Sequence, residues 1–362
     1  MQVADDPQLL DLMVKDAESA PDIYKTTHCW ILPEKAIFRE LQQLGLHDFR
    51  RRNNSALERI SPIDLVPEVG HIDLFKTRLL NNRITRKIPF WGKCLSLQSL
   101  ILNKILPVSN SYDVDDIRRL SYDFVRLHGE KRGAKPISQI EDSLAGNPED
   151  VFEIEAKPYT TQILYYYLRY AYCCKHIDFD KVDTLVELGS GFGRQVEVIK
   201  KAHPDICFLL FDLPLPLYIC DRYLSTVFPD SVVSYRETRC MESVPDIRKG
   251  KIFIFGTWKF PILDTTKIDL FWNARSLQQM EPDVIANYLG YVNSRAKNAF
   301  LKENMRGGDL AKRRGEYGVL KQTKLEGYKK MLSNFSLADV SEPVMPIGKT
   351  PPGYRDSFWK RL

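Results

Sequence analysis

Two acidic residues and a glycine-rich turn form the part of the chain best suited to bind a ligand. Glu187 lies near the end of an apolar run, the turn Gly189-Ser-Gly191-Phe-Gly193 follows it, and Asp212 ends the next apolar run, 19 residues after Gly193. Glycines let the backbone approach a ligand closely, and a helix that starts after the turn offers unpaired N–H groups. The carboxylate of Glu187 would repel a pyrophosphate but suits a cationic ligand end. The carboxylate of Asp212 can accept hydrogen bonds from both hydroxyls of a ribose.

A cationic end combined with a ribose points to S-adenosylmethionine rather than to a dinucleotide. The dinucleotide fingerprint requires GxGxxG, whereas position 194 of this chain is an arginine. We therefore predict a cofactor site that also includes Ser190 and Arg194 of the turn and Leu213 beside the second acid. The structural alternative is that Glu187 and Asp212 only cap helices. The register of strand, acid, glycine turn, helix, strand and acid favours the cofactor site, and with it a class I methyltransferase core.

The elements that must position these residues alternate between strands and helices from residue 182 onward. Short apolar runs predict strands at 182–188, 206–212, 251–256, 268–274, 298–304 and 354–360. Helices fit the gaps after Gly193, Leu213 and Pro282. This rhythm predicts an α/β fold, Rossmann-like, with a mainly parallel sheet covered by helices on both faces.

The first 150 residues have a different, helical texture. Apolar residues recur at helical spacing in 34–45, where Gly45 is the expected stop, in 95–106 and in 113–133. Residues 134–152 carry prolines, glycines and acids and are typical of a connector, and an aromatic helix is expected at 160–177. We therefore predict a helical N-terminal region, 1–150, that serves acceptor binding, a lid or oligomerisation. The α/β cofactor-binding domain is predicted at 151–362.

A set of short motifs along the chain adds a resemblance. The motifs are Trp30, 146-GNP-148, Lys157, 186-VELGSGFGR-194, 211-FDLP-214, 268-IDLFWNARSLQQM-280 and Asn304. In these motifs, from about residue 20 to the C-terminus, the chain resembles the sugar O-methyltransferase family of S-adenosylmethionine-dependent enzymes. The glycine turn is shared by many methyltransferases, so the FDLP and SLQQM segments are the more specific part of the likeness.

The resemblance implies methyl transfer from S-adenosylmethionine to a hydroxyl of a sugar, either nucleotide-linked or part of a glycan. One position departs from the family, whose motif usually ends in Glu-Met where this chain has Gln279 and Met280. If the glutamate is a base in relatives, another group must serve here, and Glu281 is the neighbouring candidate.

Candidates for the reacting side of the site follow the later strands. Asn273 and Gln279 come at and after the end of the strand at 268–274, where Asn273 could also touch the cofactor, and Glu303 is near the end of the next strand. A sugar hydroxyl is weakly acidic, so a general base helps its methylation. We take Glu303 and His28 as candidate bases, although a lone histidine is more often structural. Trp258 is a candidate neighbour of the adenine, or equally a core tryptophan.

Composition restricts the partners and the compartment. The net charge is only +5 at pH 7, and the basic clusters at 50–52, 83–87 and 312–314 are most simply solvated surface, with phosphate recognition as the alternative. No apolar run is long enough to span a membrane. Seven cysteines without paired spacing indicate reduced thiols in a cytoplasmic protein. No spacing of Asp, Glu or His signals a metal.

Other functions remain open at this level. An RNA or protein methyltransferase could use the basic clusters, a nucleotide-dependent oxidoreductase could use the same fold, and Gln279 could mark an inactive scaffold. We expect a sugar or nucleotide-sugar acceptor rather than nucleic acid, and a homo-oligomer is a further possibility.

Overall fold

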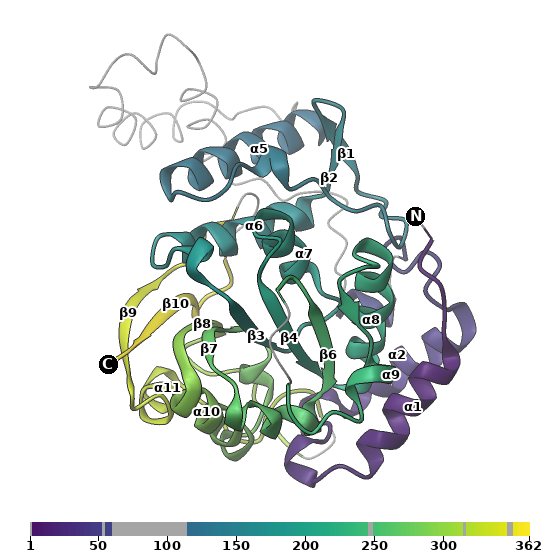
Figure 1. The fold of residues 1–362 in the computed structure, drawn as a ribbon, viewed down its shortest axis with the longest axis vertical. Coiled ribbons are helices and arrows are strands. Elements are labelled where there is room, and N and C mark those ends of the chain that lie inside the picture. Colours follow the sequence, from purple (N-terminus) through teal and green to yellow (C-terminus); the bar gives the residue numbers. More distant parts are fainter. Residues whose placement is uncertain (1, 53–54, 60–113, 245–248, 314–315, 346–349) are drawn as a thin grey trace.

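A single large sheet organises the molecule (Figure 1). The computed structural model describes residues 2–52, 55–59, 114–244, 249–313, 316–345 and 350–362. Within them the sheet has the strand order β5-β6-β4-β3-β7-β8-β10-β9. Its strands are β3 (Thr184–Leu188), β4 (Cys207–Asp212), β5 (Val232–Val233), β6 (Ile252–Gly256), β7 (Ile268–Ala274), β8 (Ala296–Asn304), β9 (Phe335–Ser341) and β10 (Tyr354–Arg361).

The sheet is mainly parallel, as predicted. Strands β5, β6, β4, β3, β7 and β8 pair in parallel, and β10 is antiparallel to both of its neighbours, β8 and β9. The chain runs outward from β3 to β4 and β6, and then returns to the other side of β3 with β7. In such sheets a ligand crevice forms at the carboxyl ends of the strands, where the order reverses. The predicted α/β, Rossmann-like fold is confirmed.

Helices cover both faces of the sheet. They are α6 (Thr161–Cys174), α7 (Arg194–Ala202), α8 (Pro214–Val227), α9 (Tyr235–Thr238), α10 (Pro282–Arg295) and α11 (Leu325–Met331). Alternate strand residues enter two separate apolar clusters, so that Leu185 packs with α6, α7 and α8, and Val186 packs with α10 and α11. This burial of both faces explains why the central strands read as continuous apolar runs in the sequence.

All six predicted strands are present, but β9 was not predicted. That strand is at the edge of the sheet, and its residues alternate between more and less buried positions without a continuous apolar run. A small hairpin of β1 (Phe152–Ile154) and β2 (Lys157–Tyr159) was also missed because each strand has only three residues. Short and half-exposed strands leave a weak pattern.

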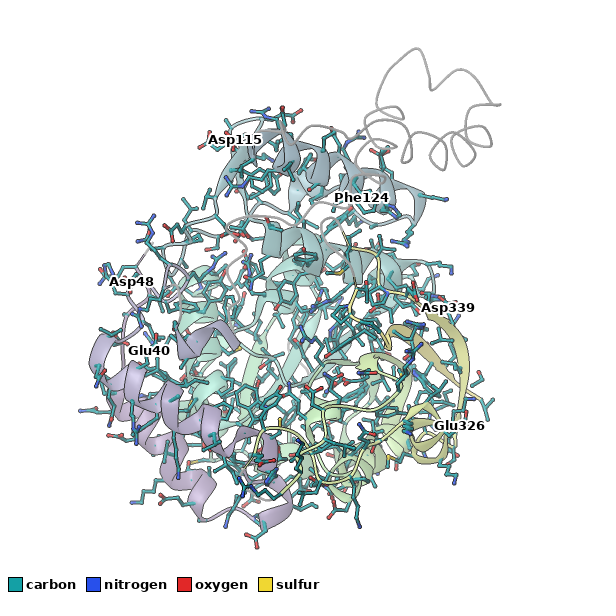
Figure 2. The ribbon with its side chains drawn as sticks, turned by 180° about the vertical axis from the view of Figure 1, so that it is seen from behind. Glu40, Asp48, Asp115, Phe124, Glu326 and Asp339 are labelled. Carbon is teal, nitrogen blue, oxygen red and sulfur yellow. The ribbon has the colours of Figure 1, made fainter. Side chains whose placement is uncertain are left out.

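The described part of the N-terminal region packs at two places on the α/β core. Helices α1 (Pro7–Glu18) and α2 (Ile31–Leu44) contact α8, whereas α5 (Val114–Lys131) lies along α6 (Figure 1). Figure 2 labels both places, with Glu40 and Asp48 at and after α2, and Asp115 and Phe124 on α5. Gly45 ends α2 with a φ of 57°, as predicted. The helix predicted at 95–106 lies outside the described residues.

Candidate functional site

The glycine turn has a backbone that only glycine adopts easily. Gly189, Gly191 and Gly193 have φ values of 78°, 55° and 90° between β3 and α7. A Cβ on Gly189 would lie 2.3 Å from the hydroxyl oxygen of Ser276. The N–H of Gly189 donates to the carbonyl of Phe211 on β4 at 2.8 Å, which fixes the turn against the neighbouring strand. The turn therefore presents its backbone to the space above the strand ends.

A cavity of about 430 Å³ lies at these strand ends. Of the predicted site residues it is lined by Glu187, Gly189, Ser190, Gly191, Asp212, Leu213 and Gln279. Gly193, Arg194, Trp258, Asn273, Glu303 and His28 are not among its lining residues. The tertiary structure thus brings together most of the predicted cofactor set and separates most of the predicted catalytic set from the cavity.

Glu187 and Asp212 are both buried at the cavity, and burial disfavours their ionised forms. Burial and then repulsion from Asp212 raise the pKa of Glu187 well above its usual range, although Arg169 opposes the shift. One carboxylate oxygen of Glu187 has no hydrogen-bond partner among the described residues. Burial raises the pKa of Asp212 to about 7, although it accepts the N–H groups of Leu213 at 2.7 Å and Gly191 at 2.8 Å. A cation beside Glu187 would relieve this cost.

Arg169 is a cavity residue that sequence reasoning missed. It projects from α6, lines the cavity, and its guanidinium lies 4.6 Å from the centre of the Tyr166 ring. Its attraction lowers the pKa of Glu187, so a cation and a carboxylate share one side of the site. The sequence signal was a single arginine within an aromatic helix, which does not distinguish a ligand-binding cation from a solvated one.

The roof of the cavity comes from the N-terminal region. Lys25, Thr27 and Trp30 line it together with Gln279. The indole N–H of Trp30 donates to the side-chain oxygen of Gln279, and the hydroxyl of Thr27 donates to the Gln279 carbonyl at 3.0 Å. His28 instead lies with its Nδ1 2.9 Å from the carbonyl oxygen of Gly318. The segment around Trp30 is therefore fixed over the strand ends by residues far away in the sequence.

Asn273 and Glu303 shape the turn that follows β7. The amide of Asn273 donates to the carbonyl of Leu188 at 2.8 Å and to the hydroxyl of Ser276. Glu303 accepts the backbone N–H groups of Arg275 and Gln278, both at 3.0 Å, and burial raises its pKa to about 8. Both side chains are thus committed to neighbouring groups and lie away from the cavity.

The other candidate base, Glu281, also has its carboxylate occupied by hydrogen bonds. Its two carboxylate oxygens accept the backbone N–H groups of Leu320 and Lys321 at 2.8 and 3.0 Å. These bonds connect the start of α10 to the loop that follows β8.

Two further predicted cofactor residues have other surroundings. Arg194 begins α7 but points into the protein, where it pairs with Asp142 at 2.6 Å and with Glu197. Trp258 packs against Gly256 and meets the Tyr235 ring edge-on at 6.1 Å. Neither Arg194 nor Trp258 is among the residues that line the cavity.

The basic cluster at 50–52 is only partly the solvated surface that we predicted, because Arg51 is exposed but Arg50 is buried. Arg50 is 3% exposed and pairs with Asp142 at 3.1 Å. Burial alone would raise the pKa of Asp142, but Arg194 and Arg50 hold it well below its usual range. The connector thus links the N-terminal region to α7 through buried charges. Residues 83–87 and Arg314 lie outside the described residues.

The described residues contain no group of three or more His, Cys, Asp or Glu side chains placed to hold a metal ion. None of their helices is both long and apolar enough to cross a membrane.

The sequence matches no protein-family model and no curated protein. Among solved structures it is similar to the mitomycin 7-O-methyltransferase MmcR, at 14% identity over 56% of this chain and 55% of that one, with a TM-score of 0.36. The pyocyanin biosynthetic protein PhzM gives 14% identity over 54% and 55%, with a TM-score of 0.36. Magnesium protoporphyrin IX methyltransferase from Synechocystis PCC 6803, with bound SAM, gives 13% identity over 70% and 100%, also with a TM-score of 0.36.

The chain spans about half the length of the first two of these structures. At such low identities and TM-scores the assignment of the fold rests on the strand order and pairing of the sheet itself.

Proposed function

We propose that this protein is an S-adenosylmethionine-dependent O-methyltransferase with a class I methyltransferase core. The observation that carries the proposal is the pair Glu187 and Asp212, two buried acids on neighbouring strand ends that flank a glycine turn. A buried carboxylate oxygen without a partner is costly unless a ligand supplies the missing donor or charge. The unpaired oxygen of Glu187 at the cavity fits a cationic group of that kind.

The residues at the cavity fit the separate parts of this cofactor. Glu187 would hold the ammonium of the methionine moiety and Asp212 the two ribose hydroxyls. Arg169, whose charge opposes the rise in the pKa of Glu187, would hold the methionine carboxylate. An amino-acid zwitterion needs a carboxylate and a cation side by side, and these two side chains provide them. A dinucleotide would instead place phosphates against Glu187.

The bound cofactor supplies a methyl group on a sulfonium, and the protein's task is alignment. Transfer requires the acceptor oxygen, the methyl carbon and the sulfur in line, and correct positioning alone contributes about 7–11 kcal/mol in favourable cases. Gln279 and Trp30, bonded to one another over the cavity, would fix the acceptor against the donor and exclude water. The transfer leaves the thioether and releases the hydroxyl proton. Gln279 is an amide and cannot accept that proton at neutral pH, so we assign Gln279 an orienting role and the proton to bulk solvent.

The acceptor that we propose is a sugar hydroxyl, on the strength of the motifs around Trp30, Asp212 and Gln279. Two of those motifs meet in the structure as the hydrogen bond between Trp30 and Gln279. A carboxylate at 279 could accept the same indole N–H, so the exchange of Glu for Gln keeps this contact. Relatives with the glutamate would gain a negative charge at the same point of the roof.

The first test is calorimetric titration with S-adenosylhomocysteine and, separately, with NAD. We expect the thioether to bind and NAD not to bind. Glu187→Gln should weaken S-adenosylhomocysteine by about 10- to 150-fold, because a charge-assisted hydrogen bond contributes about 1.5–3 kcal/mol. Glu326→Gln, on the exposed surface of α11 (Figure 2), is the matched control and should bind like the wild type.

Tight NAD binding with no response to S-adenosylhomocysteine would replace this proposal with an oxidoreductase. An RNA affinity that falls steeply with salt would favour nucleic acid as the acceptor.

A further inference from the structure

Arg275 is a cavity residue with an unusual backbone and, among the described residues, no ion-pair partner. It lies at the end of β7, lines the cavity, and has a φ of 74°. Its guanidinium stacks over the Tyr354 ring at 5.2 Å from the ring centre, which leaves the hydrogen-bonding edges of the guanidinium free. Among the described residues, no carboxylate forms an ion pair with this side chain. Arg275 is therefore an exposed cation that the fold holds at the mouth of the site.

The left-handed backbone at Arg275 is enforced by specific contacts. Its N–H donates to the carbonyl of Lys302 at 2.8 Å and to the buried carboxylate of Glu303 at 3.0 Å. A side-chain-bearing residue adopts this conformation at a cost, and such costs persist only where the surroundings over-determine them. Because strained positions cluster at functional sites, the geometry of Arg275 indicates a role for its side chain in the cavity.

Lys302 lies close to two cations that line the cavity, Arg169 and Arg275. Burial lowers the pKa of Lys302 to about 8, and repulsion from Arg169 and Arg275 adds to the effect against the opposing attraction of Asp356. Lys302 pairs with Asp356 at 3.2 Å and so is neutralised, whereas Arg275 is not. The cavity is thus lined by two acids, Glu187 and Asp212, by Arg169, which acts on Glu187, and by Arg275 at the end of β7.

We propose that the acceptor carries an anionic group, a phosphate or a carboxylate, and that Arg275 binds it. This inference rests on the proposed function, because it assigns Glu187, Asp212 and Arg169 to the methyl donor and leaves Arg275 for the acceptor. A guanidinium suits the role because its planar fork can hold two oxygens of either group at once. Arg275 thereby selects charged acceptors over neutral ones of the same shape.

The test is a calorimetric titration of the protein saturated with S-adenosylhomocysteine. The probes are inorganic pyrophosphate for a phosphate, glucuronate for a carboxylate and glucose as the neutral control. We expect at least one anion to bind more tightly than glucose, with an affinity that falls as salt is added. Arg275→Gln should weaken that anion by about 10- to 150-fold. The matched control Arg295→Gln, an exposed arginine at the end of α10, should leave it unchanged.

The outcomes separate this inference from the proposed function. If S-adenosylhomocysteine binds but neither anion binds better than glucose, or if Arg275→Gln and Arg295→Gln behave alike, the anion site is refuted and the methyl-donor site stands. If S-adenosylhomocysteine does not bind, the proposed function fails, and the same anion titrations on the free protein still decide whether Arg275 binds anions. Arg275→Lys keeps the charge without the fork and should give an intermediate affinity.

Discussion

Replacing Asp212 by asparagine should raise the free energy of unfolding of the ligand-free protein at alkaline pH and lower its affinity for S-adenosylhomocysteine. The carboxylate is buried and its pKa is raised from 3.8 to about 7. The folded state therefore binds more protons than the unfolded state between these values, so the wild type loses stability as the pH rises from about 4 to about 7. Asparagine carries no charge at any of these pH values, so the variant does not lose stability in this way as the pH rises.

The size of the effect follows from the shift. From pH 5 to pH 8 the wild type should lose about 3 kcal/mol that the variant keeps, at about 1.4 kcal/mol for each pH unit below the folded-state pKa. The amide can accept only one of the two backbone N–H groups that Asp212 now accepts, from Leu213 and Gly191, which costs the variant about 1–3 kcal/mol. Relative to the protonated form, the wild type has lost about 1.5 kcal/mol at pH 5 and about 4.5 kcal/mol at pH 8. After the cost of the lost hydrogen bond, Asp212→Asn should be about 1–3 kcal/mol more stable than the wild type at pH 8 and within about 1.5 kcal/mol of it at pH 5.

Urea unfolding of the free protein at pH 5, 6, 7 and 8 measures this difference. Asp230→Asn, which removes an exposed acid, is the control and should follow the wild type within about 0.5 kcal/mol at every pH. In the same preparations Asp212→Asn should bind S-adenosylhomocysteine more weakly, because the ribose loses a charged acceptor. Parallel stability profiles for Asp212→Asn and the wild type would refute the assignment of a raised pKa to this carboxylate.

Four further results are expected. Affinity for S-adenosylhomocysteine should rise between pH 6 and pH 8, because the ligand favours the ionised forms of Glu187 and Asp212, whose pKa values are raised. Binding should therefore release protons, which calorimetry in buffers of different ionisation enthalpy measures. An affinity that does not change with pH would contradict this. Gly189→Ala should abolish ligand binding, since its Cβ would lie 2.3 Å from the Ser276 hydroxyl and its φ is 78°; unchanged affinity would show that the turn is not the binding surface. Asp142→Asn should lower the free energy of unfolding by about 3–5 kcal/mol in urea titrations, because it leaves two buried arginines without their shared carboxylate; a loss below about 1 kcal/mol would count against the buried cluster. Trp30→Phe should raise KM for the acceptor more than it changes S-adenosylhomocysteine affinity, because it breaks the roof contact to Gln279; equal losses in both would place the roof over the donor instead.

The central sheet and the donor side of the site could be predicted because their signals are local. A fully buried parallel strand reads as an apolar run, and the acids at its carboxyl end follow within one or two residues. Glu187, Asp212 and the first half of the glycine turn, 189–191, accordingly line the cavity. The edge strand β9 left no such run, because it alternates between more and less buried residues.

Neighbours in sequence did not always share a site. Arg194 directly follows the glycine turn, yet as the first residue of α7 it turns inward to Asp142, 52 residues earlier in the chain. Glu303 and Asn273 lie at the correct edge of the sheet, but their polar atoms are taken up by backbone groups of the turn after β7. The position of a residue along a strand determines at which edge of the sheet its side chain lies. It does not determine the hydrogen-bond partners of that side chain.

The sequence by itself determined the sheet and the acids and glycines that meet at its carboxyl edge. Only the tertiary structure decided what covers that edge and how the cations are placed around it. The roof contact joins Trp30 to Gln279 across 249 residues, and Arg169 and Arg275 reach one cavity from α6 and from the end of β7. Periodicity and spacing record the contacts of a residue with its near neighbours in the chain. The partners of a long polar side chain depend on which elements pack together, and that information is spread over the whole fold.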